Sequence, residues 1–280
     1  MRGSIFTERL AALIFAALAV SVLAAIIAGK GSSTSASLRI ACANDAAGMI
    51  VVYAAEKIGG AEIKKTAGQH VSFLRFVDCC GAQAEFALGA GKFDMAVLCP
   101  DAAEMFLKNN ASFIIAGEVI RNANVLVSKT DVVPLDVGYT AGRALQGESA
   151  VAVLGDGINL IPMAPAALPY ALEKGAADAI VLDILTALKF DAGFFVITPL
   201  PRDEATSVLV VNKDVVGTEP YNNFLDAYNE SVDGMDGETL AGIFENRENI
   251  NNGKEKAVLW QKMGTAFISI PKNGHTSPDL

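Results

Sequence analysis

The sequence has 280 residues, more than one small core needs, and the length fits two lobes of ordinary domain size plus a targeting segment. The net charge of -9 at pH 7 leaves no basic stripe that could neutralise phosphates, so nucleic acid is excluded as the expected partner. Apolar residues make up 52% of the chain, but alanines and one N-terminal run inflate this share. The remainder is typical of a globular α/β protein, not of a polytopic membrane protein.

The chain begins with an uncharged apolar run at residues 10–28, between Arg9 and Lys30. A helix of that length rises about 28 Å and nearly spans a hydrocarbon core of about 30 Å. We therefore expect an N-terminal hydrophobic helix, and we favour an uncleaved membrane anchor over a cleaved signal peptide. Arg2 and Arg9, which precede this run, then stay on the cytoplasmic side, and the globular part lies on the periplasmic or cell-surface side of the cytoplasmic membrane. Residues 29–37 have the composition of a flexible tether.

After the tether, short apolar runs alternate with segments of helical periodicity. This alternation predicts two lobes, each a mainly parallel sheet flanked by helices, with ligands bound outside the carboxyl ends of the strands. The predicted strands are 38–43, 71–77, 93–98, 136–140, 158–163 and 177–183, and the predicted helices are 46–58, 82–89, 102–108, 141–154 and 166–173.

Two polar interruptions indicate where the chain crosses between the lobes. The β-rich run at 113–128 is broken at residues 121–124, and the breaker-rich stretch 198–203 is interpreted as the return crossing. A further strand at 207–212 and helices at 220–232 and 239–244 are expected to rejoin the first lobe. The predicted divisions are 1–37 for the anchor and linker, 38–122 and 206–280 for lobe 1, and 123–205 for lobe 2.

Polar loops follow the first three predicted strands, and in a parallel sheet such loops share one rim. Asp and Asn after a strand are also favoured helix caps, so capping is the alternative for each of them. The candidate ligand-binding residues on this rim are Asn44, Asp45, Asp78, Cys79, Cys80, Gly81, Pro100 and Asp101.

The second lobe and the first crossing supply the other candidates. Thr140, Gly142 and Arg143 lie between a strand and a helix, where they resemble an anion cradle; the alternative is a capping Thr beside a solvated Arg. Asp183 ends a strand on the cleft side, and its alternative is a helix cap. Arg121 and Asn122 lie at the first crossing, where they contact either the solute or only the other lobe.

Adjacent thiols at Cys79 and Cys80 are a liability in an oxidising compartment unless they have a use. They fit a redox pair, a soft-ligand clamp, or a disulfide to Cys42 or Cys99, and the last two cysteines also fit the pattern of small buried apolar residues. Because thiolates select soft partners, we predict a small thiophilic or organo-element solute held partly by Cys79 and Cys80, with any anionic end met by Thr140 and Arg143 of the second lobe.

No catalytic or cofactor motif accompanies these residues. The two histidines, His70 and His275, are badly placed for a shared zinc site or triad, and no phosphate-binding glycine loop is present. We therefore expect no cofactor, no metal and no enzymatic activity.

Three segments carry a family resemblance: ALGAGKFDMAVLCP at 87–100, ALEKGAADAIVLD at 171–183, and SVLVVNKD at 207–214 followed by Pro220 and Phe224. In this order they resemble the type II periplasmic substrate-binding proteins of the nitrate, sulfonate and pyrimidine-precursor group. The adjacent cysteines resemble a subgroup with a Cys-Cys or selenocysteine loop. The stretch between Lys129 and Val137 is shorter than the corresponding segment of that family, so the resemblance does not define where lobe 2 begins.

The resemblance implies a two-lobed extracytoplasmic protein that captures a small solute and delivers it to an ABC permease with its ATPase. It also implies a membrane contact through the N-terminal helix. Two alternatives stay open at the level of sequence. The first is a thiol- or metal-dependent enzyme on the same fold, and the second is a ligand-sensing lobe of a membrane signalling system.

Overall fold

The computed structural model describes residues 38–59, 71–76, 88–190, 195–200 and 203–272. The predicted N-terminal helix and the loop that holds Asp78, Cys79, Cys80 and Gly81 lie outside these ranges. Among the described residues, no helix combines the length and the apolar character needed to cross a membrane.

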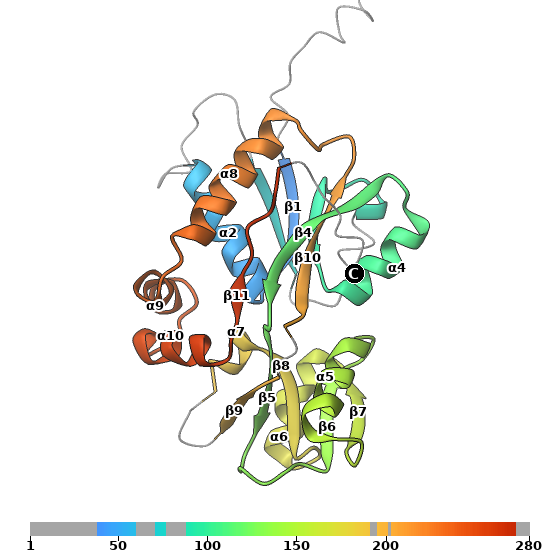
Figure 1. Cartoon of the computed structure of the whole chain (residues 1–280), viewed down its shortest axis with the longest axis vertical. Coiled ribbons are helices and arrows are strands. Elements are labelled where there is room, and N and C mark those ends of the chain that lie inside the picture. Colours follow the sequence, from blue (N-terminus) through green and yellow to red (C-terminus); the bar gives the residue numbers. More distant parts are fainter. Residues whose placement is uncertain (1–37, 60–70, 77–87, 191–194, 201–202, 273–280) are drawn as a thin grey trace, which may run out of the picture. The chain divides into compact units, whose positions relative to one another are not determined.

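The first sheet has six strands in the order β11-β4-β10-β3-β1-β2 (Figure 1). β1 runs parallel to β2 and β3, whereas β10 runs antiparallel to both β3 and β4, and β11 runs antiparallel to β4. The bounds are Leu38–Ala43 for β1, Val71–Phe76 for β2, Met95–Leu98 for β3, Phe113–Arg121 for β4, Ala205–Asn212 for β10 and Ala266–Phe267 for β11.

The second sheet has five strands in the order β7-β6-β8-β5-β9. β6 runs parallel to β7 and β8, and β5 runs antiparallel to β8 and β9. The bounds are Asn124–Ser128 for β5, Asp136–Thr140 for β6, Asn159–Met163 for β7, Ala179–Asp183 for β8 and Val196–Pro199 for β9.

Helices pack on both sheets. On the first sheet, α2 packs against β1 and α8, and α4 packs against β10; on the second, α5 and α6 pack against β6 and β8 (Figure 1). The bounds are Ala46–Gly59 for α2, Pro100–Asn109 for α4, Ala144–Leu154 for α5, Leu168–Lys174 for α6, Ile184–Ala187 for α7, Glu219–Asp233 for α8, Gly237–Asn246 for α9 and Gly253–Lys262 for α10, with a short 3-10 turn at Pro165–Ala167.

The expected α/β class with two sheets is confirmed, and β1, α2, β6 and β8 begin within two residues of the predicted positions. Each sheet is mixed, however, rather than mainly parallel. In the first sheet the reason is the return crossing: β10 comes back from the second sheet and inserts between β3 and β4 in the reverse direction, whereas β4 itself points the same way as β3.

The return crossing begins later than predicted. Thr198 and Pro199, expected in the crossing, still pair with Leu126 and Val125 of β5 as the end of β9. Proline is tolerated there because β9 is an edge strand of the second sheet. On its open side no neighbouring strand needs a backbone N–H group, which proline lacks.

Aromatic side chains of α8 hold the returning part of the chain on the first sheet. Tyr221, Phe224 and Tyr228 recur at helical spacing on one face and are fully buried. The Tyr228 hydroxyl donates to the carbonyl of Val119 at 3.0 Å, so its polar end is satisfied inside the core. This packing fixes β4, the strand that leads into the first crossing.

The two crossings are hydrogen-bonded to each other. Asn122 has a left-handed backbone with φ of 54°, which asparagine tolerates better than most residues. Its backbone N–H donates to the carbonyl of Glu204, and its side-chain oxygen accepts from the N–H of Glu204. Its side-chain amide also donates to the carbonyl of Gly264. Three chain segments therefore meet at one asparagine.

Candidate functional site

Asp45 lies just after β1, in the loop that opens helix α2. Its Oδ1 accepts the backbone N–H of Gly48 at 2.8 Å, which is the geometry of an N-cap, and the residue is only 8% exposed. The capping alternative is therefore realised. The cap also fixes a carboxylate at the carboxyl end of a central strand, so capping and solute binding are compatible here.

Asp183 ends β8 in the second sheet and connects the two sheets. Its Oδ1 accepts the N–H of Leu185, which caps α7, and it also accepts the N–H of Ala46, the first residue of α2, at 3.1 Å. One carboxylate of the second sheet thus occupies the N-terminus of a helix on the first sheet, where the helix dipole favours negative charge.

Arg143 follows β6 and interacts electrostatically with both carboxylates. The residue is 8% exposed, and loss of hydration lowers the pKa of its guanidinium, while the charges of Asp45 and Asp183 act in the opposite direction. Arginine stays charged under all such shifts. The cluster therefore contains one fixed positive charge and two carboxyl groups.

The carboxyl groups of this cluster are poised to hold a proton. Loss of hydration raises the pKa of Asp183 to about 7, and repulsion by Asp45 adds to this effect, whereas the N–H groups of Ala46 and Leu185 oppose it. Loss of hydration likewise raises the pKa of Asp45, although the Gly48 N–H and Arg143 lower it. Perturbed carboxyl groups of this kind concentrate at functional sites.

A small cavity adjoins Arg143. Its volume of about 10 Å³ is room for roughly one water molecule. Beside it the Oδ2 of Asp101, in the first turn of α4, lies 3.4 Å from the backbone nitrogen of Leu145 in α5, a second contact between the two sheets. The lining residues are Cys99, Pro100, Asp101, Asn124, Arg143, Leu145, Gln146, Glu204, Ala205 and Thr206.

The structure brings together many of the predicted residues, but not all. Asp45, Arg143 and Asp183 form one cluster, and Pro100 and Asp101 line the adjoining cavity. Thr140 is buried and its N–H donates to Gln146, whereas Asn44 and Gly142 are exposed, with Gly142 in a left-handed turn at φ of 84° before α5. The predicted helix start at 141 is therefore wrong by three residues.

Arg121 contacts acidic groups at the crossing. Its guanidinium pairs with both oxygens of Glu118, at 2.5 and 2.9 Å, and with Asp203 at 3.1 Å. The hydrogen bond to Glu118 raises the pKa of the arginine. Arg121 and Asn122 therefore both lie where the chain crosses between the two sheets. Of the two roles that the sequence allowed them, contact with the solute or contact with the other lobe, this position favours the second.

Several polar residues of the cavity were missed by the sequence analysis. Gln146 is 2% exposed, and its Nε2 donates to Asn124 at 3.0 Å while its Oε1 accepts from Thr140. Thr206 and Glu204 come from the return crossing; the Thr206 hydroxyl donates to the carbonyl of Ile120. The available signal was a glutamine in the first turn of a helix that directly follows a strand.

The cysteines that the structure describes are buried. Cys42 lies inside β1 at 0% exposure, and Cys99 precedes α4 at 7% exposure. Both positions agree with the alternative that these two residues are small buried apolar side chains. Among the described residues, no group of three His, Cys, Asp or Glu side chains is arranged to hold a metal ion.

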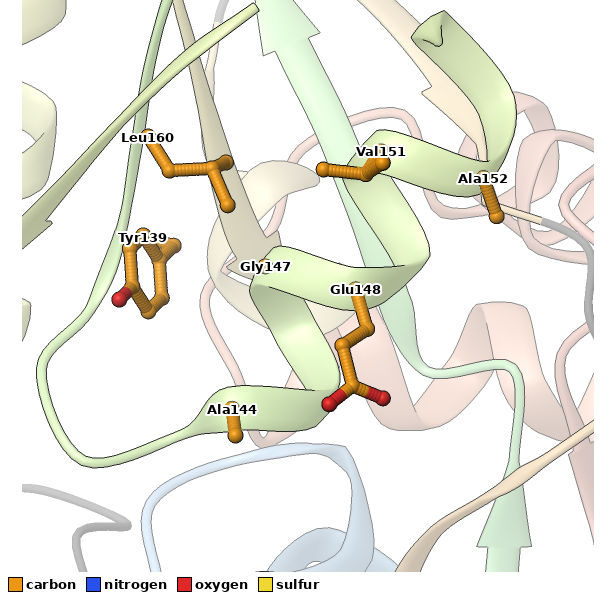
Figure 2. A pocket seen from close by; sticks show the side chains of 7 residues that line it. All are labelled: Tyr139, Ala144, Gly147, Glu148, Val151, Ala152 and Leu160. Atoms are coloured by element: carbon orange, nitrogen blue, oxygen red, sulfur yellow. The ribbon is translucent and has the colours of Figure 1, made fainter. Parts of the chain in front are cut away.

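A larger hollow lies elsewhere, between α5 and the strands β6 and β7 of the second sheet. It has a volume of about 460 Å³ and is lined by Tyr139, Leu160 and one face of α5, including Gly147 and Glu148 (Figure 2). It is broad and open, and among the described residues that line it only Glu148 carries a charge. The smaller cavity beside Arg143 is where polar groups of both sheets converge, so we place the candidate site there.

Searches by sequence found neither a matching protein-family model nor a matching curated protein. Solved structures match the fold. The ligand-binding component of an ABC-type import system from Staphylococcus aureus, solved with zinc bound, aligns with a TM-score of 0.65 and 13% identity over 84% of this chain and 86% of that one.

Two further structures agree with this match. A Candida albicans protein with the generic periplasmic binding protein fold aligns with a TM-score of 0.59 and 15% identity over 84% of this chain and 82% of that one. The alkanesulfonate-binding protein of Xanthomonas axonopodis, bound to MOPS, aligns with a TM-score of 0.53 and 15% identity, covering 85% and 81% of the two chains. The chain therefore has the periplasmic binding protein fold.

Proposed function

We propose that this chain is the solute-binding component of an ABC importer, and that it captures a small solute between its two sheets and delivers it to a membrane permease. The observation that carries the proposal is the cluster of Asp45 from one sheet with Arg143 and Asp183 from the other. These residues lie at the carboxyl ends of β1, β6 and β8, where open α/β sheets bind ligands. The similarity to import proteins supports it.

The proposal includes a place outside the cytoplasm, on the periplasmic or cell-surface side, with residues 10–28 as the membrane contact. The domain divisions predicted from the sequence remain part of the proposal. The hydrogen-bonded crossings at Asn122 and Glu204 are its hinge, because two short connections are the parts that absorb a change of backbone angles on closure.

The described charges favour a solute that carries both a cationic and an anionic group. The carboxyl groups of Asp45 and Asp183 outnumber the single guanidinium of Arg143, and an ammonium group in the cleft would relieve their mutual repulsion. Arg143 and Thr140 remain the proposed partners of an anionic end. Cys79 and Cys80 remain proposed as soft ligands for a thiophilic part of the solute.

A thermal-shift screen of the chain against amino acids, amines, sulfonates and inorganic oxyanions tests the function. A solute present at about 100 times its Kd stabilises the folded state by about 2.7 kcal/mol, which corresponds to a rise in Tm of about 5–10 °C for a protein of this size. The proposal expects such a rise with one chemical class. No shift with any class would contradict it.

The same samples separate binding from catalysis. Mass spectrometry of the stabilising solute after prolonged incubation should recover it unchanged if the chain is a binding protein. Conversion that depends on Cys79 and Cys80 would instead favour the thiol-dependent enzyme.

A further inference from the structure

The contact between Asp183 and the N-terminus of α2 exists only when the two sheets are close together. The Asp183 Oδ1 lies 3.1 Å from the Ala46 nitrogen, although the two residues are separated by 137 positions and belong to different sheets. Separating the sheets breaks this bond and returns the carboxyl group of Asp183 to water. Closure and the environment of Asp183 are therefore linked.

The charged groups that face Asp183 come from both sides of the cleft. Asp45 faces it from the loop before α2, and Arg143 faces it from the loop before α5. Asp101 and Glu204 are the next acidic groups and line the small cavity on which Arg143 also borders. Closing an empty cleft consequently confines more negative than positive charge in a place with little water.

We propose that closure of the empty clamp takes up one proton at the buried carboxyl cluster, chiefly at Asp183, so that acidity favours the closed form. This inference concerns the regulation of the proposed binding site and rests on the proposed function for its hinge motion. A solute with a cationic group would take the place of that proton, which would let the loaded clamp close at a pH where the empty clamp stays open.

The direction of the pH dependence follows from the two environments of the carboxyl group. In water an aspartate has a pKa of about 3.9, whereas closure raises the pKa of Asp183 to about 7. Between these values the closed form holds one proton more than the open form. The closure constant is then largest below about pH 4, falls by up to about tenfold per pH unit, and becomes level above about pH 7.

Fluorescence energy transfer across the cleft measures closure without any solute. Lys108 of α4 and Lys174 of α6 lie on helices that pack against different sheets, and their side chains are 65% and 54% exposed. Ketone-bearing residues at these two positions accept a donor and an acceptor dye and leave the native cysteines unlabelled. With the full chain in detergent, we expect the closed fraction to fall as the pH rises from 5 to 7 and to stay constant from 7 to 8.

Asp183→Asn keeps an oxygen that accepts from Ala46 and Leu185 but removes the charge. Its closed fraction should change far less between pH 5 and 8 than that of the unmodified chain. Asp45→Asn keeps the cap of α2 and removes the repulsion, so the midpoint of the transition should move to lower pH. Asp156 is an exposed aspartate between α5 and β7. Asp156→Asn removes the same charge outside the cleft, so its closed fraction should depend on pH as that of the unmodified chain does.

A closed fraction that is independent of pH in the unmodified chain would overturn the inference, as would an Asp183→Asn variant that follows the unmodified curve. Circular dichroism at each pH identifies a variant that has lost its fold. If Asp183→Asn does not fold, the Asp45→Asn variant tests the inference instead, and a midpoint that does not move to lower pH would overturn it. Failure of the proposed function is a different result, the absence of any stabilising solute in the thermal-shift screen.

Discussion

Replacing Arg143 with methionine is expected to abolish most solute binding. The guanidinium interacts electrostatically with Asp45 and Asp183, and removing one member of a buried charged cluster typically costs about 2–5 kcal/mol of binding free energy. The Kd of the solute found by thermal shift should rise by at least about 30-fold. Isothermal titration at pH 7.5 measures this change directly.

Arg247→Met is the matched control. Arg247 follows α9, far along the chain from the cluster, and it pairs with Glu56 and lies over the ring of Tyr53 at 5.0 Å. Its replacement removes the same charge from the outside of the first sheet and should leave the Kd unchanged. Equal affinities in the Arg143→Met variant and the unmodified chain would mean that the solute binds elsewhere.

Replacing Gly48 with alanine is expected to destabilise the fold strongly. A Cβ atom at this position would lie 1.9 Å from the carbonyl oxygen of Ala43, a backbone atom at the end of β1. The helix and the strand must separate to admit it, which costs about 3 kcal/mol, at the upper end of overpacking effects. Urea unfolding should show a lower midpoint with an unchanged slope.

Gly242→Ala is the control for this effect. Gly242 lies inside α9, and the nearest atom to the methyl group that alanine adds would be the side-chain nitrogen of Asn246 at 4.0 Å. Alanine is a better helix former than glycine, so this variant should be about 0.5–1 kcal/mol more stable. If Gly48→Ala unfolds at the same urea concentration as the unmodified chain, α2 does not approach β1 as closely as described.

The central residues of the site were predictable because they obey a local rule. Asp45 and Asp183 each lie at the carboxyl end of a strong apolar strand, just before a helix, and the carboxyl ends of such strands are where ligands bind. The same pattern, however, describes an ordinary helix cap. The sequence could not show that Asp183 caps α7 and also reaches the N-terminus of α2, since that contact joins residues 137 positions apart.

The mixed sheets and the missed cavity residues share one cause. The direction of β10 and the position of Glu204 depend on how the returning chain packs against β3 and β4, and no short-range periodicity encodes that pairing. Gln146 of α5 likewise owes its role to Asn124, the first residue of β5. Strand positions are local properties, whereas strand order and buried polar partners are set by tertiary packing.

Small-angle X-ray scattering with and without the identified solute tests the clamp most directly. The fragment that begins at Ser37 forms one compact unit and suits this measurement. If the solute binds between the two sheets, saturating concentrations should decrease the radius of gyration, most clearly at pH 8, where the empty cleft is expected to be open. A radius of gyration that does not change, with the solute shown to be bound by titration in the same buffer, would contradict the account.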